Sequence, residues 1–102
     1  LGSLNVDISK GAFGGNAALQ LADFGATPTA SKAATFIGTP VNNWYSARIS
    51  DQHLNKINLV GLTQFRLRFN LDDNDNNSAN YLVFYSGSAT DKPTLNLTYY
   101  LP

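Results

Sequence analysis

The sequence feature that most constrains the fold is a strict alternation of residue types in the middle of the chain. Between residues 62 and 71, one set of alternate positions is mainly apolar and the other set is polar. The first set is Thr63, Phe65, Leu67, Phe69 and Leu71, and the second is Gln64, Arg66, Arg68 and Asn70. Because successive side chains of a β-strand point to opposite faces, this pattern predicts a strand with one face on the core. A shorter alternation of Leu4, Val6 and Ile8 with polar residues predicts a second such strand.

The composition favours strands and turns over long helices. The chain of 102 residues contains seven acidic residues, all of them Asp, and no Glu. Glu is a good helix former, whereas Thr and the aromatic residues suit strands. Further strands are expected over residues 33–37, 44–49, 81–86 and 94–101, and short helices over residues 17–24 and 51–58. We therefore predict a single all-β domain over residues 1–102, a jelly-roll-like antiparallel β-sandwich with two short helical turns.

Charge and cysteine content exclude several classes of function. Seven basic and seven acidic residues give a formal net charge of zero, so the sequence lacks the basic surface typical of proteins that bind nucleic acid. Without Cys, the chain cannot form disulfides, thiolate zinc sites or a thiol nucleophile. No apolar run approaches the ~20 residues that span a bilayer, so no membrane span is expected.

The ionisable residues form no pattern typical of catalysis. Glycosidase chemistry needs two carboxylates that flank a cleft, and outside residues 72–75 the Asp residues are scattered along the chain. His53 is the only His and has no second metal ligand or nucleophile in a matching pattern. The glycine-rich segment 11–15 lacks the lysine of a phosphate-binding loop. We therefore expect a protein that is not an enzyme.

A series of short motifs extends over nearly the whole chain. In the first half they are Gly-Ser-Leu at 2–4, Val-Asp-Ile at 6–8, Gly11, Phe13, Ala-Leu-Gln at 18–20, Asp-Phe at 23–24 and Trp-Tyr-Ser at 44–46. In the second half they are Gly-Leu-Thr-Gln-Phe-Arg-Leu-Arg-Phe at 61–69, Asp-Asp-Asn-Asp at 72–75, Tyr-Leu at 81–82, Phe-Tyr-Ser-Gly at 84–87, Pro-Thr-Leu at 93–95 and Thr-Tyr-Tyr at 98–100. Together they resemble the C-terminal part of the DNRLRE-domain family, which is also called disaggregatase-related.

This resemblance implies a β-sandwich module of secreted or cell-surface proteins in bacteria and archaea. Such modules are often appended to other domains and are grouped near the jelly-roll carbohydrate-binding modules. Family members extend well upstream of the position that matches Leu1. We therefore expect an incomplete domain, whose sheet is completed by a separate chain, by further residues of the same protein, or by strand addition from a neighbouring subunit.

Trp44 and Arg48 are candidate carbohydrate-binding residues. In the expected strand 44–49, alternation places Trp44, Ser46 and Arg48 on the outer face. An exposed aromatic ring can stack on the apolar face of a sugar, and the guanidinium group can donate to its hydroxyl groups. The alternative is that Trp44 packs beneath the loop formed by residues 38–43.

Arg66 and Arg68 are the second pair of candidate carbohydrate-binding residues. They share the polar face of the strand predicted over residues 62–71. Guanidinium groups can bind an acidic sugar or another carboxylate through two parallel hydrogen bonds. The alternative is a solvated face with cross-strand pairs, which would include Asp7 if its strand is adjacent.

Residues 72–78 form a candidate calcium site. The segment reads Asp-Asp-Asn-Asp-Asn-Asn-Ser, and its proposed ligands are Asp72, Asp73, Asp75 and Asn77. Calcium takes six to eight oxygen ligands, which such a loop could supply. The EF-hand pattern fails, because its sixth position would be Ser78 and its twelfth would be Phe84. The alternative is a tight turn in which Asp and Asn side chains bond to their own backbone.

These observations and the resemblance together suggest two main functions, both for an extracellular or cell-surface protein. The first is a non-catalytic extracellular module that attaches a larger protein or a cell surface to polysaccharide. The second is a structural subunit of a filament, matrix or surface layer, whose sheet is completed by a neighbouring chain through self-association. A third reading is a spacer that calcium stabilises and that binds no other ligand.

Overall fold

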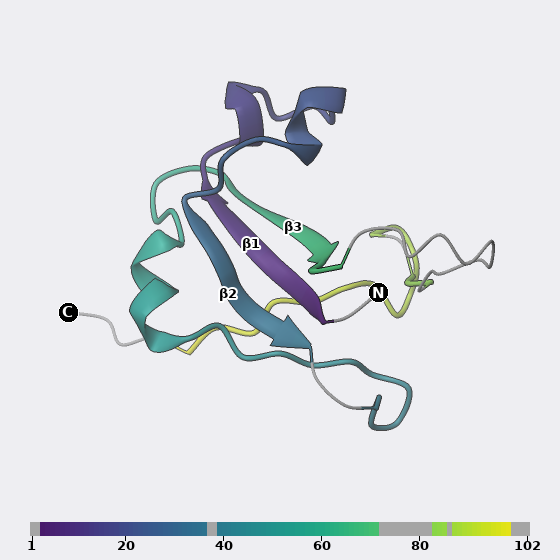
Figure 1. Cartoon of the computed structure of the whole chain (residues 1–102). Helices are drawn as coiled ribbons and strands as arrows, with labels where there is room; N and C mark the ends of the chain where they lie inside the picture. Colours follow the sequence, from purple (N-terminus) through teal and green to yellow (C-terminus); the bar gives the residue numbers. More distant parts are fainter. Residues whose placement is uncertain (1–2, 37–38, 72–82, 86, 99–102) are drawn as a thin grey trace.

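The protein contains a small antiparallel sheet, which makes it mostly β. The computed structural model describes residues 3–36, 39–71, 83–85 and 87–98. Its strands are β1 (Leu4–Lys10), β2 (Ala30–Phe36) and β3 (Thr63–Phe69). The central strand β1 pairs with β2 on one side and with β3 on the other, both antiparallel, in the order β2-β1-β3 (Figure 1). The first strand of the chain therefore lies between β2 and β3, and its pairing with β3 joins residues that are far apart in the sequence.

The pairing of β1 with β3 confirms the two alternations predicted from the sequence. Leu4, Val6 and Ile8 lie opposite Phe69, Leu67 and Phe65, so the apolar residues of both strands share one face. On the other face, Asn5, Asp7 and Ser9 lie opposite Arg68, Arg66 and Gln64. Side chains directly opposite each other in a ladder are neighbours on the same face, so this register produces one apolar face and one polar face.

The buried core lies at one end of the apolar face. Ile8 is fully buried with Ala30 and Ala33 of β2. Ile49 and Ile57, which flank the 3₁₀ helix η3 (Asp51–Lys56), pack against this cluster together with Phe65 of β3. The small side chains of β2 allow the segment around η3 to approach the sheet closely, so η3 closes this end of the core.

The helical predictions are confirmed in part. The turn expected over residues 51–58 is η3, whose bounds are Asp51–Lys56. The helix expected over residues 17–24 is only the short 3₁₀ helix η2 (Leu21–Phe24), and another 3₁₀ turn, η1 (Phe13–Gly15), precedes it. The Asn16 side chain accepts a hydrogen bond from the Ala18 N–H at 2.9 Å. Such local bonds stabilise a bend in competition with a helix.

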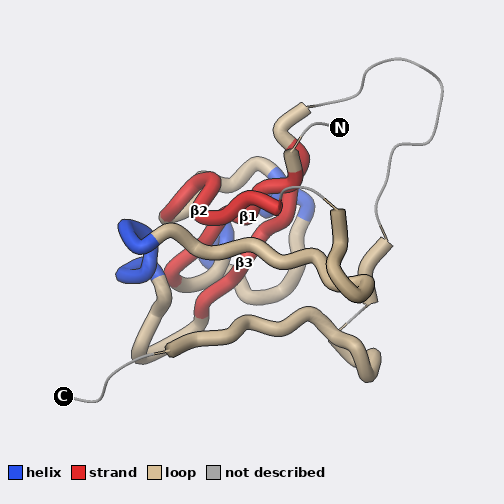
Figure 2. Tube along the Cα trace, turned by 90° about the horizontal axis from the view of Figure 1, so that it is seen from below, coloured by secondary structure: helices blue, strands red, loops and turns tan. Residues whose placement is uncertain are grey.

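Several predicted strands are wrong within the described residues. Residues 45–49 form no strand, and Trp44 makes only an isolated bridge with Val41. Residues 83–85 and 94–98 are also without strand structure, and the remainder of the predicted strands 81–86 and 94–101 lies outside the described residues. These segments have strand-like side chains, but they cross one side of the sheet as loops (Figure 2). Among the described residues, none of them joins the sheet formed by β1, β2 and β3.

The predicted short strand 33–37 exists but begins earlier, at Ala30. The polar residues 31 and 32 interrupt the alternation of apolar and polar residues, so the sequence did not show where the strand begins. The interruption coincides with an irregularity in the ladder, at which Lys32 has a positive φ of 53°. The structure therefore shows one three-stranded sheet, and the second sheet of the predicted jelly-roll-like sandwich is not found in the part of the chain that is described.

Replacement of Ile8 tests this assignment of the core. The Ile8→Ala substitution removes three buried carbon atoms from the core, and we expect it to lower the free energy of unfolding by about 2–5 kcal/mol. Leu59→Ala is the matched control, because Leu59 is 91% exposed and its truncation should leave stability nearly unchanged. Urea denaturation followed by circular dichroism measures both. Equal stability of the two variants would contradict the assigned core.

Candidate functional site

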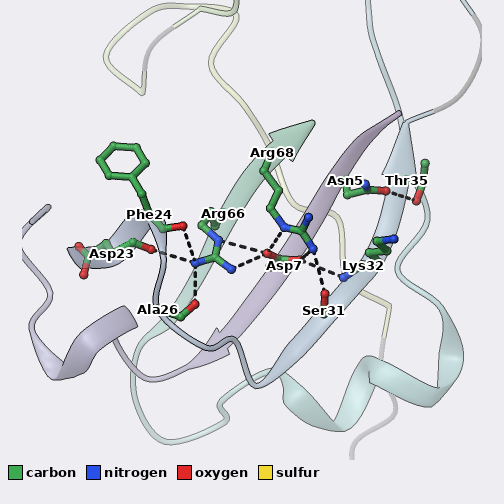
Figure 3. A network of polar contacts seen from close by, with 10 residues as sticks. All are labelled: Asn5, Asp7, Asp23, Phe24, Ala26, Ser31, Lys32, Thr35, Arg66 and Arg68. Carbon is green, nitrogen blue, oxygen red and sulfur yellow. Dashed lines mark hydrogen bonds and ion pairs between the residues drawn. The ribbon is translucent and has the colours of Figure 1, made fainter. Parts of the chain in front are cut away.

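The polar face of the sheet is organised around a buried carboxylate. Asp7 lies in the middle of the central strand and is completely buried. Arg66 lies directly opposite it in the ladder, and Arg68 follows two residues later on the same face of β3. Because alternate residues of a strand share a face, both guanidinium groups can reach the same carboxylate (Figure 3).

The Asp7 carboxylate accepts hydrogen bonds from both arginines. Its Oδ2 atom lies 3.1 Å from Nε and 2.7 Å from Nη2 of Arg66, and 2.7 Å from Nε of Arg68. Its Oδ1 atom accepts from Arg68 Nη2 at 3.3 Å and from the backbone N–H of Lys32 at 2.9 Å. The alternative predicted from the sequence, that these arginines pair with Asp7 across the strands, is thus confirmed.

The bond from Lys32 depends on an irregularity in β2. The register between β1 and β2 shifts between Val6 and Ile8, and Lys32 adopts a positive φ there. Such bulges disrupt the ladder locally and free a backbone group from it. Here the freed N–H group points to the Asp7 side chain, so β2 contributes a backbone donor to the cluster while β3 contributes two side chains.

These contacts keep Asp7 ionised. Burial disfavours the charged form and by itself would raise the pKa of Asp7. Hydrogen bonds from Arg68, the Lys32 backbone and Arg66 oppose it, and the net effect lowers the pKa from 3.8 to about 2. The same hydrogen bond to Asp7 raises the pKa of Arg68.

Arg66 also connects the sheet to the segment that carries η1 and η2. Its NH1 group donates to the carbonyl oxygens of Asp23 at 2.9 Å and Ala26 at 2.7 Å. Its guanidinium carbon lies 4.7 Å from the centre of the Phe13 ring, within the range of a cation–π contact. The Arg66 side chain is only 15% exposed, so its position is set by these contacts on both sides.

A cleft lies on the other side of the sheet. Its volume is about 1280 Å³, and the apolar side chains of Leu4, Phe36, Leu67 and Phe69 line it from the sheet. The opposite wall comes from residues 43–49, 51 and 54 and from residues 83–85, 91 and 93–98. These loops leave part of the apolar face accessible to solvent. Leu67 on β3, for example, is 46% exposed.

Trp44 enters this cleft from a tight turn. Val41 and Trp44 exchange both backbone hydrogen bonds at 2.9 Å, and Asn42 and Asn43 between them have positive φ values of 51° and 67°. Two successive residues of this kind form the turn that suits a two-residue hairpin, and Asn tolerates the conformation well. Trp44 leaves the turn at the wall of the cleft and is 45% exposed.

Other aromatic residues of the cleft were not assigned to a site by sequence reasoning. Tyr45 and Phe84 meet edge to face, with ring centroids 6.3 Å apart, and Tyr85 is exposed beside them. Alternation in the expected strand 44–49 predicts Tyr45 on the inner face, so the sequence does not indicate it as a binding residue. The aromatic content of residues 84–85 was the available signal, but the sequence does not show that these residues line the same cleft as Trp44.

Arg48 lines the same cleft as Trp44. It is not part of the cluster in which Arg66 and Arg68 bind the Asp7 carboxylate. Its NH2 group makes an ion pair with Asp51 at 3.0 Å, and its side chain is 82% exposed. Such an exposed pair contributes little to stability. The structure therefore brings Trp44 and Arg48 together in the cleft, whereas Arg66 and Arg68 belong to the cluster around Asp7, and of the latter two only Arg68 also lines the cleft.

The candidate calcium ligands Asp72, Asp73, Asp75 and Asn77 lie outside the described residues, so the calcium site stays a prediction. Among the residues that are described, no group of three or more His, Cys, Asp or Glu side chains could hold a metal ion. His53 forms a hydrogen bond through Nδ1 with Ser50 Oγ at 2.7 Å. In the same part of the chain, no helix has the length and apolar character needed to cross a membrane.

Comparison with known proteins gives no assignment: no family model, curated protein or solved structure matches the chain. The resemblance to the DNRLRE-domain family therefore stays a prediction.

Removal of the Asp7 charge tests the importance of the cluster. We expect Asp7→Asn to lower the free energy of unfolding by about 3–5 kcal/mol, because it leaves two guanidinium groups without their shared counter-charge. Asp51→Asn is the control, since it breaks only the exposed pair with Arg48 and should cost less than ~1 kcal/mol. Chemical denaturation at neutral pH measures both variants, and similar losses would show that the cluster has no special role.

The lowered pKa of Asp7 also predicts the direction of the pH dependence. The unfolded chain binds a proton at Asp7 near pH 3.8, whereas the folded chain binds it only near pH 2. The stabilisation is therefore complete above about pH 4 and is lost as the pH falls toward 2, and it amounts to about 2 kcal/mol. Denaturation curves between pH 6 and 2 should show this loss in the wild type and not in Asp7→Asn.

Proposed function

We propose that this protein is a non-catalytic extracellular module that attaches a larger protein or a cell surface to polysaccharide. The observation that carries the proposal is the cleft on the apolar side of the sheet, where Trp44, Tyr45 and Tyr85 line a wall together with polar side chains. Aromatic rings supply apolar contact area, and their polar neighbours supply hydrogen bonds that orient a ligand.

The form of the cleft supports an extended ligand. Its lining comes from the sheet and from two loop segments, which include Trp44 and residues 93–98. Asn43, Arg48, Asp91 and Asn96 provide donors and acceptors along this wall. A chain of sugar rings presents alternating apolar faces and hydroxyl groups, which such a mixed wall can match.

Fluorescence of Trp44 tests the proposal directly, because it is the only tryptophan in the chain. We expect at least one polysaccharide of a broad panel to change its emission in a saturable way. By calorimetry, Trp44→Ala should weaken binding by about 2 kcal/mol, which corresponds to roughly thirtyfold in Kd. Leu59→Ala, which lies outside the cleft, should bind normally. A panel without any binding would contradict the proposed function.

A structural subunit is the second candidate function, and the open side of β3 favours it. Within the described residues, β3 pairs with β1 and has no strand on its other side, and Leu67 is half-exposed on the apolar face. Unpaired strand edges are templates for another strand. A neighbouring chain that completes the sheet here would bury this edge and part of the apolar face.

Light scattering over a range of protein concentrations distinguishes this second candidate. A structural subunit should form oligomers or fibres that Leu67→Lys disrupts, because the added charge would lie where the apolar faces meet. Unfolding of the variant by heat checks that it still folds. A monomer at all concentrations would contradict the structural candidate and leave the attachment module.

A further inference from the structure

Exposed apolar side chains gather at the end of the sheet where β1 ends and β3 begins. They come from two segments, residues 17–26 between η1 and β2 and residues 57–62 before β3. We call the following six side chains the apolar tip: Leu19, Leu21, Phe24, Leu59, Val60 and Leu62. Leu21 is 88% exposed and Val60 is 97% exposed. Outside the cleft, the only other large hydrophobic residues that are exposed in the described part of the chain are Val41 and Leu71.

Hydrogen bonds hold both segments at this end of the sheet. The Gly11 N–H donates to the Leu62 carbonyl oxygen at 2.8 Å, which joins the end of β1 to the residue before β3. The Gln64 side chain donates to the Ala17 carbonyl oxygen at 3.1 Å, which joins the other segment to the start of β3. Both segments therefore lie beside the first residues of β3, at the same end of the sheet (Figure 1).

The apolar tip has almost no charge of its own. Residues 11–29 and 57–62 include one charged residue, Asp23, and it is buried. Each of these two segments begins directly after a lysine, Lys10 at the end of β1 and Lys56 at the end of η3. Lys10 lies opposite Thr63 in the ladder, and the Asn58 N–H donates to Thr63 Oγ1 at 2.8 Å. The tip thus has basic neighbours and no exposed acidic side chain within its own segments.

We infer that the apolar tip docks onto the surface of an anionic lipid bilayer. Apolar side chains stabilise a protein on a bilayer when they enter the boundary between headgroups and acyl chains, and lysines close to the surface attract anionic lipids. Charged side chains are costly inside the bilayer, so a tip whose segments contain only one buried acid can enter the boundary. Such a contact is peripheral and needs no membrane-spanning helix.

A second copy of the chain fits this surface less well. Contact between two tips would bring Lys10 and Lys56 of both copies together, and the segments of the tip offer no exposed carboxylate to pair with them. Like charges brought together across an interface are destabilising. An anionic bilayer instead supplies an opposite charge to each lysine. The charge pattern therefore favours lipid over self-association.

The apolar tip and the cleft lie at opposite ends of the sheet. The sheet residues that line the cleft include Leu4 at the start of β1, Phe36 at the end of β2 and Phe69 at the end of β3. The tip lies beyond the other end of β1, after Lys10. A bilayer at the tip leaves this end of the cleft uncovered, so the inference does not depend on the proposed function.

Sedimentation with lipid vesicles tests the inference. The probes are vesicles of phosphatidylcholine and vesicles of phosphatidylcholine mixed with anionic phosphatidylglycerol. We expect the full chain to bind the mixed vesicles roughly tenfold more tightly at low salt and to lose this preference as salt is added. Equal binding to both kinds of vesicle at low salt, or no binding to either, overturns the inference.

Charged substitutions locate the contact. Leu21→Asp combined with Leu59→Asp places one charge in each segment of the tip, and we expect vesicle binding to fall at least roughly tenfold. Leu71→Asp is the matched control, because Leu71 is also exposed but follows β3 at the opposite end of that strand. All three side chains are exposed, so thermal unfolding should show that both variants fold. Unchanged binding of the tip variant, or an equal loss in the control, overturns the inference.

Lys10→Gln combined with Lys56→Gln tests the charge separately and leaves the apolar side chains intact. We expect binding to mixed vesicles to weaken roughly tenfold, and binding to neutral vesicles to stay the same. An unchanged preference for mixed vesicles overturns the inference. Light scattering provides a further check: a dimer that Leu21→Asp with Leu59→Asp dissociates would assign the tip to a second copy and overturn the lipid assignment.

The outcomes for lipid and for polysaccharide are independent. If a glycan changes Trp44 fluorescence and no vesicle binds, the inference is wrong and the proposed function stands. If mixed vesicles bind through the tip and no glycan binds, the inference stands and the proposed function is wrong.

Discussion

The rest of the structure depends on the buried ionic contact between Asp7 and the two arginines of β3. An isolated carboxylate in the centre of a sheet would be very costly, so β1 can occupy the middle position only while Arg66 and Arg68 lie beside it. The same Arg66 binds the carbonyl groups near η2, and the bulge at Lys32 adds a backbone donor from β2. The Asp7 carboxylate thus connects all three strands, and Arg66 extends the contact to the segment between β1 and β2.

The division of the sheet into two chemically different faces explains how one small module can offer two kinds of surface. The apolar face forms the core at the Ile8 end and, toward Leu67, lines the cleft that also contains Trp44. The polar face is occupied by its own ion pairs, in which Arg66 and Arg68 share the Asp7 carboxylate. Arg68 is among the residues around the cleft, but its guanidinium group lies over Asp7 and Ser31 on the polar face.

Sequence reasoning predicted the parts of this arrangement that depend on period-two alternation. It predicted β3, most of β1 and the separation of their faces, because these follow from local pattern. The pairing of Arg66 and Arg68 with Asp7 was only the alternative to carbohydrate binding, because it depends on which strands are adjacent. It was wrong for residues 45–49, since alternation does not show whether a strand has a partner in a ladder. It also could not predict the bulge at Lys32 or the meeting of Tyr45 with Phe84, because both depend on how distant segments pack.

The long separation between Asp7 and its arginines has a consequence for biosynthesis. The ion pairs join residues 59 and 61 positions apart, whereas β1 and β2 are close in sequence and can form a hairpin early. A chain emerging from the ribosome exposes Asp7 on one side of that hairpin until residues 63–69 follow. The central strand β1 therefore completes its pairing only after β3 has been synthesised. Any product that ends before β3 retains an unpaired edge on β1 and the uncompensated negative charge of Asp7. Such products are natural substrates for chaperones and proteases.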